Sequence, residues 1–153
     1  MTTSRRDFVQ LSILVGGAAG LGLSARAAVA AADVGTAEKK LKILVLGGTG
    51  LIGPPMVSYA IARGHEVTLF NRGKTNVDLF PDLEKVRGDR NDDITALEAQ
   101  VAAGRRWDAV VDNTASIPRW VTESAGLLSK AANYYLYTSS ISAYADSSTP
   151  NAD

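Results

Sequence analysis

The stretch KILVLGGTGLIGPPM, from Lys42 to Met56, is the most informative part of the sequence about the fold. Apolar residues lead directly into a run of glycines, and Pro54 and Pro55 follow where a helix is expected to begin. A short continuous apolar run is typical of a buried strand in a parallel sheet. Prolines are tolerated in the first turn of a helix because the amide protons there have no intrahelical partner. The stretch therefore predicts a strand, a glycine-rich turn and a helix.

Short apolar runs and helical patterns alternate along the rest of the chain. The predicted strands cover 41–47, 65–71, a short run ending near Arg87, 107–113 and 134–140. The predicted helices cover 51–63, 92–104 with Asp92 or Asp93 as the cap, and 117–133 with Pro118 in the first turn. Strands and helices that alternate at this spacing predict right-handed crossovers and a parallel sheet covered on both faces. The predicted fold is a doubly wound α/β domain.

The composition narrows the classes of function. The chain has 153 residues, 46% of them hydrophobic and 21% charged, which is typical of one globular domain. Sixteen basic and sixteen acidic residues give a formal charge of zero, so we expect no nucleic-acid partner. No cysteine and only one histidine are present, and we therefore expect no metal site built from these ligands and no cysteine nucleophile.

The glycines have the spacing of a phosphate-binding turn. Gly48-x-Gly50-x-x-Gly53 satisfies the dinucleotide fingerprint, and a pattern that starts at Gly47 fits a close variant of it. Gly50 lets the backbone approach a pyrophosphate, Gly53 lets the helix pack close to the sheet, and the anion lies at the helix N-terminus. A purely structural glycine turn is the alternative. The candidate cofactor-binding residues of this turn are Gly47, Gly48, Thr49, Gly50, Leu51, Ile52 and Gly53.

The end of the second predicted strand bears on the choice of dinucleotide. An acidic residue there would bond the ribose 2′-hydroxyl and repel a 2′-phosphate. This chain has Asn71 and Arg72 instead. A neutral amide removes the repulsion, and a guanidinium binds phosphate with two parallel hydrogen bonds. The sequence therefore favours NADP over NAD, with a basic surface turn that binds no ligand as the alternative.

The first residues have the parts of an export signal. Arg5 and Arg6 precede Phe8, and a run of about 13 weakly apolar residues follows from Leu11 to Leu23. A bilayer core needs roughly 20 apolar residues, so we expect no permanent membrane span. The start resembles the twin-arginine signal Ser/Thr-Arg-Arg-x-Phe-Leu-Lys, with Val and Gln in the last two positions. The resemblance implies recognition of Arg5 and Arg6 by the twin-arginine export machinery.

Small residues provide a cleavage site after this run. We expect cleavage after Ala30 or Ala32, which makes 1–32 the signal peptide and 33–40 a polar lead. The product would be periplasmic or extracellular. An N-terminal helix of the domain and an uncleaved anchor are the alternatives.

With these motifs, the region from Leu41 to Asp146 resembles the N-terminal part of an extended, atypical short-chain dehydrogenase/reductase of the NAD(P)-dependent epimerase/dehydratase family. The resemblance implies a Rossmann-type doubly wound parallel sheet within 41–153. It rests on GGTGLIG, on GDRND at 88–92, on DNTAS at 112–116 and on the segment YTSSISAYAD. It implies that the Asp89 carboxylate bonds the adenine amino group, with Arg90 in the same motif, and that the backbone at Asn113 and Ala115 passes under the cofactor.

The resemblance also implies a catalytic hydroxyl and a proton-transfer pair. Ser140, with Ser139 as the alternative, would polarise the substrate's carbonyl or hydroxyl group. The family's general acid/base is a tyrosine four residues before a lysine, and no Tyr-x-x-x-Lys occurs in this sequence. We expect that pair beyond the chain end, with the sheet truncated after its fifth strand.

These observations leave three hypotheses. The first is the NAD(P)-binding domain of an exported oxidoreductase of the epimerase/dehydratase type, acting on a sugar-nucleotide or a similar hydroxyl/carbonyl substrate. The second is a non-catalytic nucleotide- or RNA-binding module of the same fold. The third is an inactive truncation whose fifth strand, YYLY, is an uncovered apolar edge.

Overall fold

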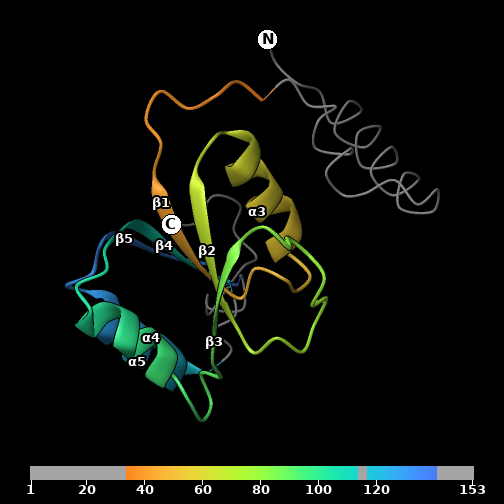
Figure 1. Cartoon of the computed structure of the whole chain (residues 1–153). Coiled ribbons are helices and arrows are strands. Elements are labelled where there is room, and N and C mark those ends of the chain that lie inside the picture. Colours follow the sequence, from red (N-terminus) through yellow and green to blue (C-terminus); the bar gives the residue numbers. More distant parts are fainter. Residues whose placement is uncertain (1–33, 114–116, 141–153) are drawn as a thin grey trace, which may run out of the picture.

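The computed structural model describes residues 34–113 and 117–140. These residues form five strands and three helices, and Figure 1 shows the sheet between α3 on one side and α4 and α5 on the other. The strands are β1 (Lys42–Leu46), β2 (Glu66–Asn71), β3 (Glu84–Arg87), β4 (Trp107–Asp112) and β5 (Ala132–Tyr137). The helices are α3 (Gly53–Ala62), α4 (Thr95–Ala102) and α5 (Pro118–Leu128).

All strand pairs in the sheet are parallel, and the strand order is β3-β2-β1-β4-β5. The chain crosses from one half of the sheet to the other between β3 and β4, so the strand order reverses next to β1. In this arrangement the crevice outside the carboxyl ends of the strands is the usual place for a ligand. Leu46 pairs with both Phe70 and Asp112, which brings the ends of three strands together at that crevice. The predicted doubly wound α/β sheet is confirmed.

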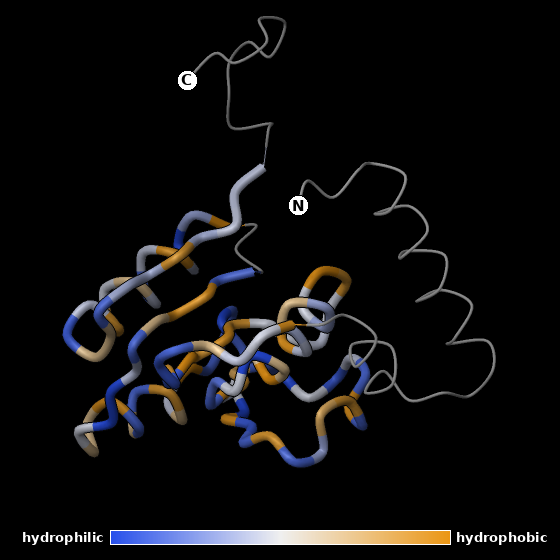
Figure 2. Tube along the Cα trace, turned by 90° about the horizontal axis from the view of Figure 1, so that it is seen from above, coloured by the Kyte–Doolittle hydropathy of each residue, from blue (hydrophilic) through white to orange (hydrophobic). Residues whose placement is uncertain are grey.

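Each face of the sheet has its own apolar core. On the α3 face, Val45, Val67 and Leu69 pack with Val57 of the helix. On the other face, α4 and α5 cover the larger cluster. That cluster contains Leu44, Leu46, Phe70, Val86, Leu97, Trp107, Val110, Leu128 and Ala131. Figure 2 shows hydrophobic and hydrophilic stretches alternating along the chain, as expected when each element buries only part of its surface.

Several predicted boundaries were wrong by a few residues. Helix α3 begins at Gly53 rather than at position 51, because the two prolines occupy its first turn. Helix α4 begins at Thr95, and its N-cap residue is Ile94 rather than Asp92 or Asp93. The Asp93 carboxylate instead accepts a hydrogen bond at 2.9 Å from the backbone amide of Thr95, the first residue of the helix. Strand β5 begins at Ala132, two residues earlier than predicted, since backbone pairing with β4 extends that far.

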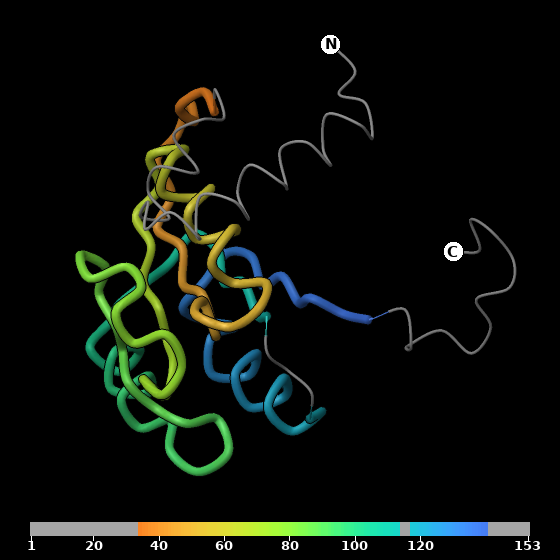
Figure 3. The backbone as a smooth tube through the Cα atoms, turned by 90° about the vertical axis from the view of Figure 1, so that its right-hand side faces the viewer, coloured from red at the N-terminus to blue at the C-terminus, as the bar shows by residue number. Residues whose placement is uncertain are grey.

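The edge strand β5 exposes apolar side chains. Tyr134 and Leu136 are 71% and 52% exposed, as predicted for an uncovered edge. Beyond β5, the described chain leads away from the body of the domain in Figure 3, where it is drawn in blue. Within residues 34–113 and 117–140, no helix is long and apolar enough to cross a membrane.

Candidate functional site

The glycine turn follows β1 directly and is fixed at its start. Gly47 has a φ of 87°, a left-handed conformation that side-chain-bearing residues rarely adopt. Its amide donates a hydrogen bond to the Phe70 carbonyl at 2.9 Å, so the turn leaves the sheet in register with β2. At its far side, the Asn76 side-chain amide donates to the Thr49 carbonyl at 3.0 Å. The turn is therefore held from two sides before any ligand binds.

The three glycines of the fingerprint have different surroundings. A Cβ atom on Gly53 would lie 2.5 Å from the carbonyl carbon and oxygen of Gly48, so these two backbones touch. A Cβ on Gly48 would lie 2.7 Å from the Leu69 side chain. A Cβ on Gly50 would meet nothing within 4 Å. Gly48 and Gly53 are therefore required for packing, whereas nothing in the described protein requires a glycine at position 50.

A cleft of about 420 Å³ lies over the carboxyl ends of β1, β2 and β3, a volume within the usual range for ligand pockets. Gly50 lines this cleft, and a Cβ atom on it would meet open space. The cleft brings together seven of the predicted residues from three separate turns. They are Gly47, Thr49 and Gly50 after β1, Asn71 and Arg72 at the end of β2, and Asp89 and Arg90 after β3.

The end of β2 is basic and lacks an acidic side chain. The Asn71 side-chain oxygen accepts hydrogen bonds from the Gly73 amide at 2.9 Å and from the Arg87 guanidinium. These bonds fix the orientation of the Asn71 amide, and its buried Nδ2 has no hydrogen-bond partner in the described part of the chain. Arg72 is more than half exposed and lies 4.0 Å from the Asp89 carboxylate. Lys74 also lines the cleft, and Arg87, bonded to Asn71, lies next to this end of it.

The turn after β3 is held by its own backbone. Asp89 and Asp93 exchange two backbone hydrogen bonds, each 2.7 Å long. The Asp89 carboxylate accepts a third from the Asn91 amide at 3.0 Å. Gly88 packs on the ring of Phe70, where a Cβ would lie only 2.7 Å away. The turn therefore presents Asp89 to the cleft in a fixed position.

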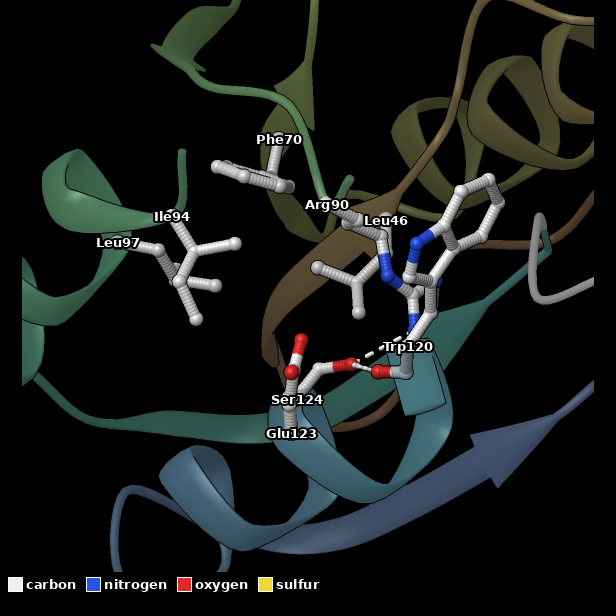
Figure 4. A pocket seen from close by; sticks show the side chains of 8 residues that line it. All are labelled: Leu46, Phe70, Arg90, Ile94, Leu97, Trp120, Glu123 and Ser124. Carbon is white, nitrogen blue, oxygen red and sulfur yellow. Dashed lines mark hydrogen bonds between the residues drawn. The ribbon is translucent and has the colours of Figure 1, made fainter. Parts of the chain in front are cut away.

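Arg90 turns inward from the same segment. Its guanidinium forms a two-pronged ion pair with the Asp112 carboxylate, with N–O distances of 2.6 and 2.9 Å, and it also donates to the Ser124 hydroxyl at 2.7 Å. Arg90 is 8% exposed and Asp112 is fully buried. Figure 4 shows Arg90 between Ser124 and the indole of Trp120. The terminal nitrogens of Arg90 thus tie the turn after β3 to β4 and α5.

Tyr135 of β5 completes this buried network. Its hydroxyl donates a hydrogen bond to the Asp112 carboxylate at 2.6 Å. Burial, together with this hydrogen bond, raises the pKa of Tyr135 to about 12. The phenol is therefore a neutral donor throughout the physiological pH range.

The remaining predicted residues lie outside the cleft or outside the described residues. Asn113 follows β4, donates its amide to the Leu46 carbonyl at 3.2 Å, and accepts a bond from the Thr138 hydroxyl at 2.8 Å. Leu51 and Ile52 are exposed at the start of α3. Ser139 and Ser140 are exposed on the segment that leads away from the domain in Figure 3. Ala115 lies outside the described residues.

The sequence analysis missed three residues of the site. Trp120 lines the cleft from α5, Arg87 holds Asn71, and Asn76 holds the glycine turn. Arg87 could have been found from strand register, because Asn71 and Arg87 pair at the ends of neighbouring parallel strands. No sequence signal marks Asn76 or Trp120.

A parallel sheet of this order, with a glycine turn between its first strand and first helix, defines a Rossmann-type α/β domain. Residues 43–151 match the sequence model of the NAD dependent epimerase/dehydratase family, and the chain belongs to that family. The membership of the epimerase/dehydratase family that the motifs predicted is therefore confirmed.

Solved structures share this fold. An epimerase from Methanothermobacter thermautotrophicus superposes with a TM-score of 0.61 at 17% identity, over 75% of this chain and 40% of that one. The Bordetella bronchiseptica enzyme WbmG, solved in complex with NAD, gives 0.54 at 20% identity, over 65% and 37% of the two chains. A UDP-glucose 4-epimerase gives 0.53 at 18% identity, over 69% and 37%.

Two curated proteins are similar in sequence. A 2-alkyl-3-oxoalkanoate reductase from Stenotrophomonas maltophilia is 34% identical over 85 residues, which are 52% of this chain and 23% of the reductase. A bifunctional pinoresinol-lariciresinol reductase 2 from Linum usitatissimum is 39% identical over 46 residues, 30% of this chain and 14% of that one. The chain thus spans less than a quarter of either relative.

Proposed function

We propose that this domain binds a nicotinamide dinucleotide in the cleft, with the pyrophosphate over the glycine turn. The proposal rests on Gly50, because this residue lines the cleft and a Cβ atom on it would meet no atom of the described protein within 4 Å. The backbone of Thr49, Leu51 and Ile52 would hold the phosphates at the N-terminus of α3. Asp89 would accept a hydrogen bond from the adenine amino group.

We propose NADP as the preferred cofactor. Asn71 is neutral at the position where an acid would repel a 2′-phosphate, and its side-chain oxygen is already occupied by Gly73 and Arg87. Arg72 is more than half exposed and free to reach a phosphate, because its distance to Asp89 is at the limit of an ion pair. Arg72, Lys74 and Arg87 together give this end of the cleft a positive field.

A titration of the 153-residue chain with NADPH and NADH tests both proposals. We expect tighter binding of NADPH, and an Arg72→Ala variant is expected to bind NADPH about tenfold more weakly while NADH changes little, since a charged hydrogen bond contributes about 1.5–3 kcal/mol. Arg106→Ala is the matched control, because Arg106 is exposed next to the start of β4, at the other end of the sheet. Equal affinity for the two dinucleotides, unaffected by Arg72→Ala, would contradict the NADP preference.

We further propose that the domain serves an oxidoreductase acting on a hydroxyl or carbonyl group, in a sugar-nucleotide or a similar substrate. The names of the similar proteins, reductases and epimerases, support this class. When bound, the nicotinamide supplies hydride transfer. In this chain the hydroxyl of Ser140, or of Ser139, would polarise the substrate oxygen. Because no Tyr-x-x-x-Lys occurs among the 153 residues, we expect this chain to bind the cofactor without turnover.

We also propose export by the twin-arginine route, which carries folded proteins and so suits a domain that must capture its cofactor first. Support comes from Arg5 and Arg6 ahead of the weakly apolar run and from small residues at 30–32. The double variant Arg5→Lys and Arg6→Lys is expected to keep the chain in the cytoplasm of a bacterial host. Export of the wild-type chain from a host that lacks the twin-arginine machinery would contradict the route.

A further inference from the structure

Trp120 is a large aromatic residue in the wall of the cleft. It lies in the first turn of α5, where Pro118 begins the helix and the Trp120 amide donates to the Ile117 carbonyl at 3.0 Å. The indole is only partly buried, and it lines the same cleft as the glycine turn. Its Nε1 atom is nevertheless buried and has no hydrogen-bond partner in the described part of the chain.

Arg90 presents a second unmatched donor beside it. The terminal nitrogens of its guanidinium are occupied by Asp112 and Ser124, but the buried Nε has no partner among the described residues. The guanidinium carbon lies 5.9 Å from the centre of the Trp120 ring, and Figure 4 shows the two side chains next to each other. Since Arg90 is only 8% exposed, its Nε is a buried donor at the wall of the cleft. Buried donors of this kind normally have an acceptor.

Trp107 shows that an unpartnered indole nitrogen does not by itself indicate a ligand-binding residue. Trp107 also has an Nε1 without a partner, but it is 3% exposed in the core and does not line the cleft. Arg105 lies over its face at 5.2 Å, and both residues belong to the opposite end of the sheet. Of the two tryptophans, Trp120 alone combines the unmatched donor with a position in the lining of the cleft.

The position of Trp120 in the cleft indicates which part of a dinucleotide would contact it. A dinucleotide with its pyrophosphate at Gly50 and its ribose at Asn71 extends its base past the turn after β3. That turn presents Asp89, and Trp120 closes the cleft from α5. Adenine fits both features, because it has a flat π face and several unprotonated ring nitrogens that accept hydrogen bonds. We propose that Trp120, backed by the Nε of Arg90, is an adenine-binding residue of the cofactor site.

The inference rests on the proposed function and assigns the base end of the same site. Stacking of a base on an aromatic side chain is lost when the aromatic ring is replaced by an aliphatic side chain. Trp120→Leu is therefore expected to weaken binding of NADPH about tenfold, and to weaken binding of its adenosine-side fragment 2′,5′-ADP by a similar factor. Trp120→Phe keeps a ring and removes the N–H group, so its effect is expected to be smaller.

Calorimetric titration of the 153-residue wild-type chain and its variants tests this. Tyr59→Leu is the matched control, since Tyr59 is an exposed aromatic residue on α3 that does not line the cleft. Melting temperatures show whether each variant folds, and Trp120→Phe decides the question if Trp120→Leu does not fold. Wild-type affinity for NADPH and 2′,5′-ADP in a folded Trp120→Leu chain, or in Trp120→Phe if Trp120→Leu does not fold, would overturn the inference alone. Failure of the folded wild-type chain to bind either ligand would overturn the proposed function and the inference with it.

Discussion

The buried ion pair between Arg90 and Asp112 gives a prediction of large magnitude. Asp112→Asn keeps the shape of the side chain and removes its charge. Arg90 would then remain 8% exposed, between α5 and the sheet, without the carboxylate that now lies 2.6 and 2.9 Å from its nitrogens. Breaking a buried pair by removing one partner is strongly destabilising because it leaves an uncompensated charge in a medium of low dielectric constant.

We expect Asp112→Asn to lower the free energy of unfolding by about 3 kcal/mol, at the lower end of the range for such pairs, because an asparagine oxygen still accepts one hydrogen bond. This is a large part of the roughly 5–15 kcal/mol that stabilises a typical domain. Urea denaturation of the 153-residue chain, followed by circular dichroism, measures the change. Replacing both residues, as Arg90→Met with Asp112→Leu, is expected to cost less than the sum of the two single changes.

A loss smaller than about 1 kcal/mol on Asp112→Asn would show that Arg90 is not left as an uncompensated buried charge. It would mean that water reaches the Arg90 guanidinium and screens it as on a protein surface.

The remaining predictions concern packing and pH. Gly53→Ala forces a Cβ to within 2.5 Å of the Gly48 carbonyl and is expected to lower the melting temperature by several degrees, measured calorimetrically, whereas an unchanged value would show that this contact relaxes freely. The hydrogen bond to Arg105 lowers the pKa of Glu84, so the stabilising contribution of Glu84 is present above the ordinary pKa of 4.5 and is lost below it. Glu84→Gln should therefore reduce the change in the free energy of unfolding between pH 5 and 3, measured by urea denaturation. An unchanged pH dependence would contradict this. The pKa of Tyr135 is raised from 10.0 to about 12, so its contribution to the free energy of unfolding is present below pH 10 and is lost as the pH rises through 12. Tyr135→Phe should remove this loss of stability at alkaline pH. A loss of the same size in the variant would show that another group causes it.

The strands and the parallel, doubly wound type of sheet could be predicted from sequence because the patterns that define the strands and helices are local. The run at β1 is apolar at every residue after Lys42, as a strand buried on both faces requires, and β4 has four apolar residues among six. The start of β5 was less predictable, since Ala132 and Asn133 have no strand preference and are drawn into the sheet by backbone pairing with β4. The start of α4 was misplaced because Asp93 bonds the Thr95 amide from outside the helix.

In the candidate site too, features within one stretch of sequence could be predicted, whereas contacts between distant residues could not. The glycine turn is one continuous stretch of sequence, and the basic end of β2 is another. The structure places both at one cleft. The bond between Arg90 and Asp112 joins residues 22 apart, and the one between Asn76 and Thr49 joins residues 27 apart. Each depends on how loops fold back over the sheet, which no local pattern encodes. Trp120 reads in the sequence as an ordinary residue of an amphipathic helix.

Dinucleotide binding at the glycine turn can be tested by measuring NADPH binding to the 153-residue chain with and without Gly50→Val. A side chain at position 50 meets nothing within 4 Å of its Cβ in the described protein, so the melting temperature is expected to stay the same. The same side chain would occupy the place where the pyrophosphate approaches the backbone, so binding is expected to be lost. Loss of NADPH binding with an unchanged melting temperature is the predicted result. Undiminished binding by the Gly50→Val chain would contradict the proposed site.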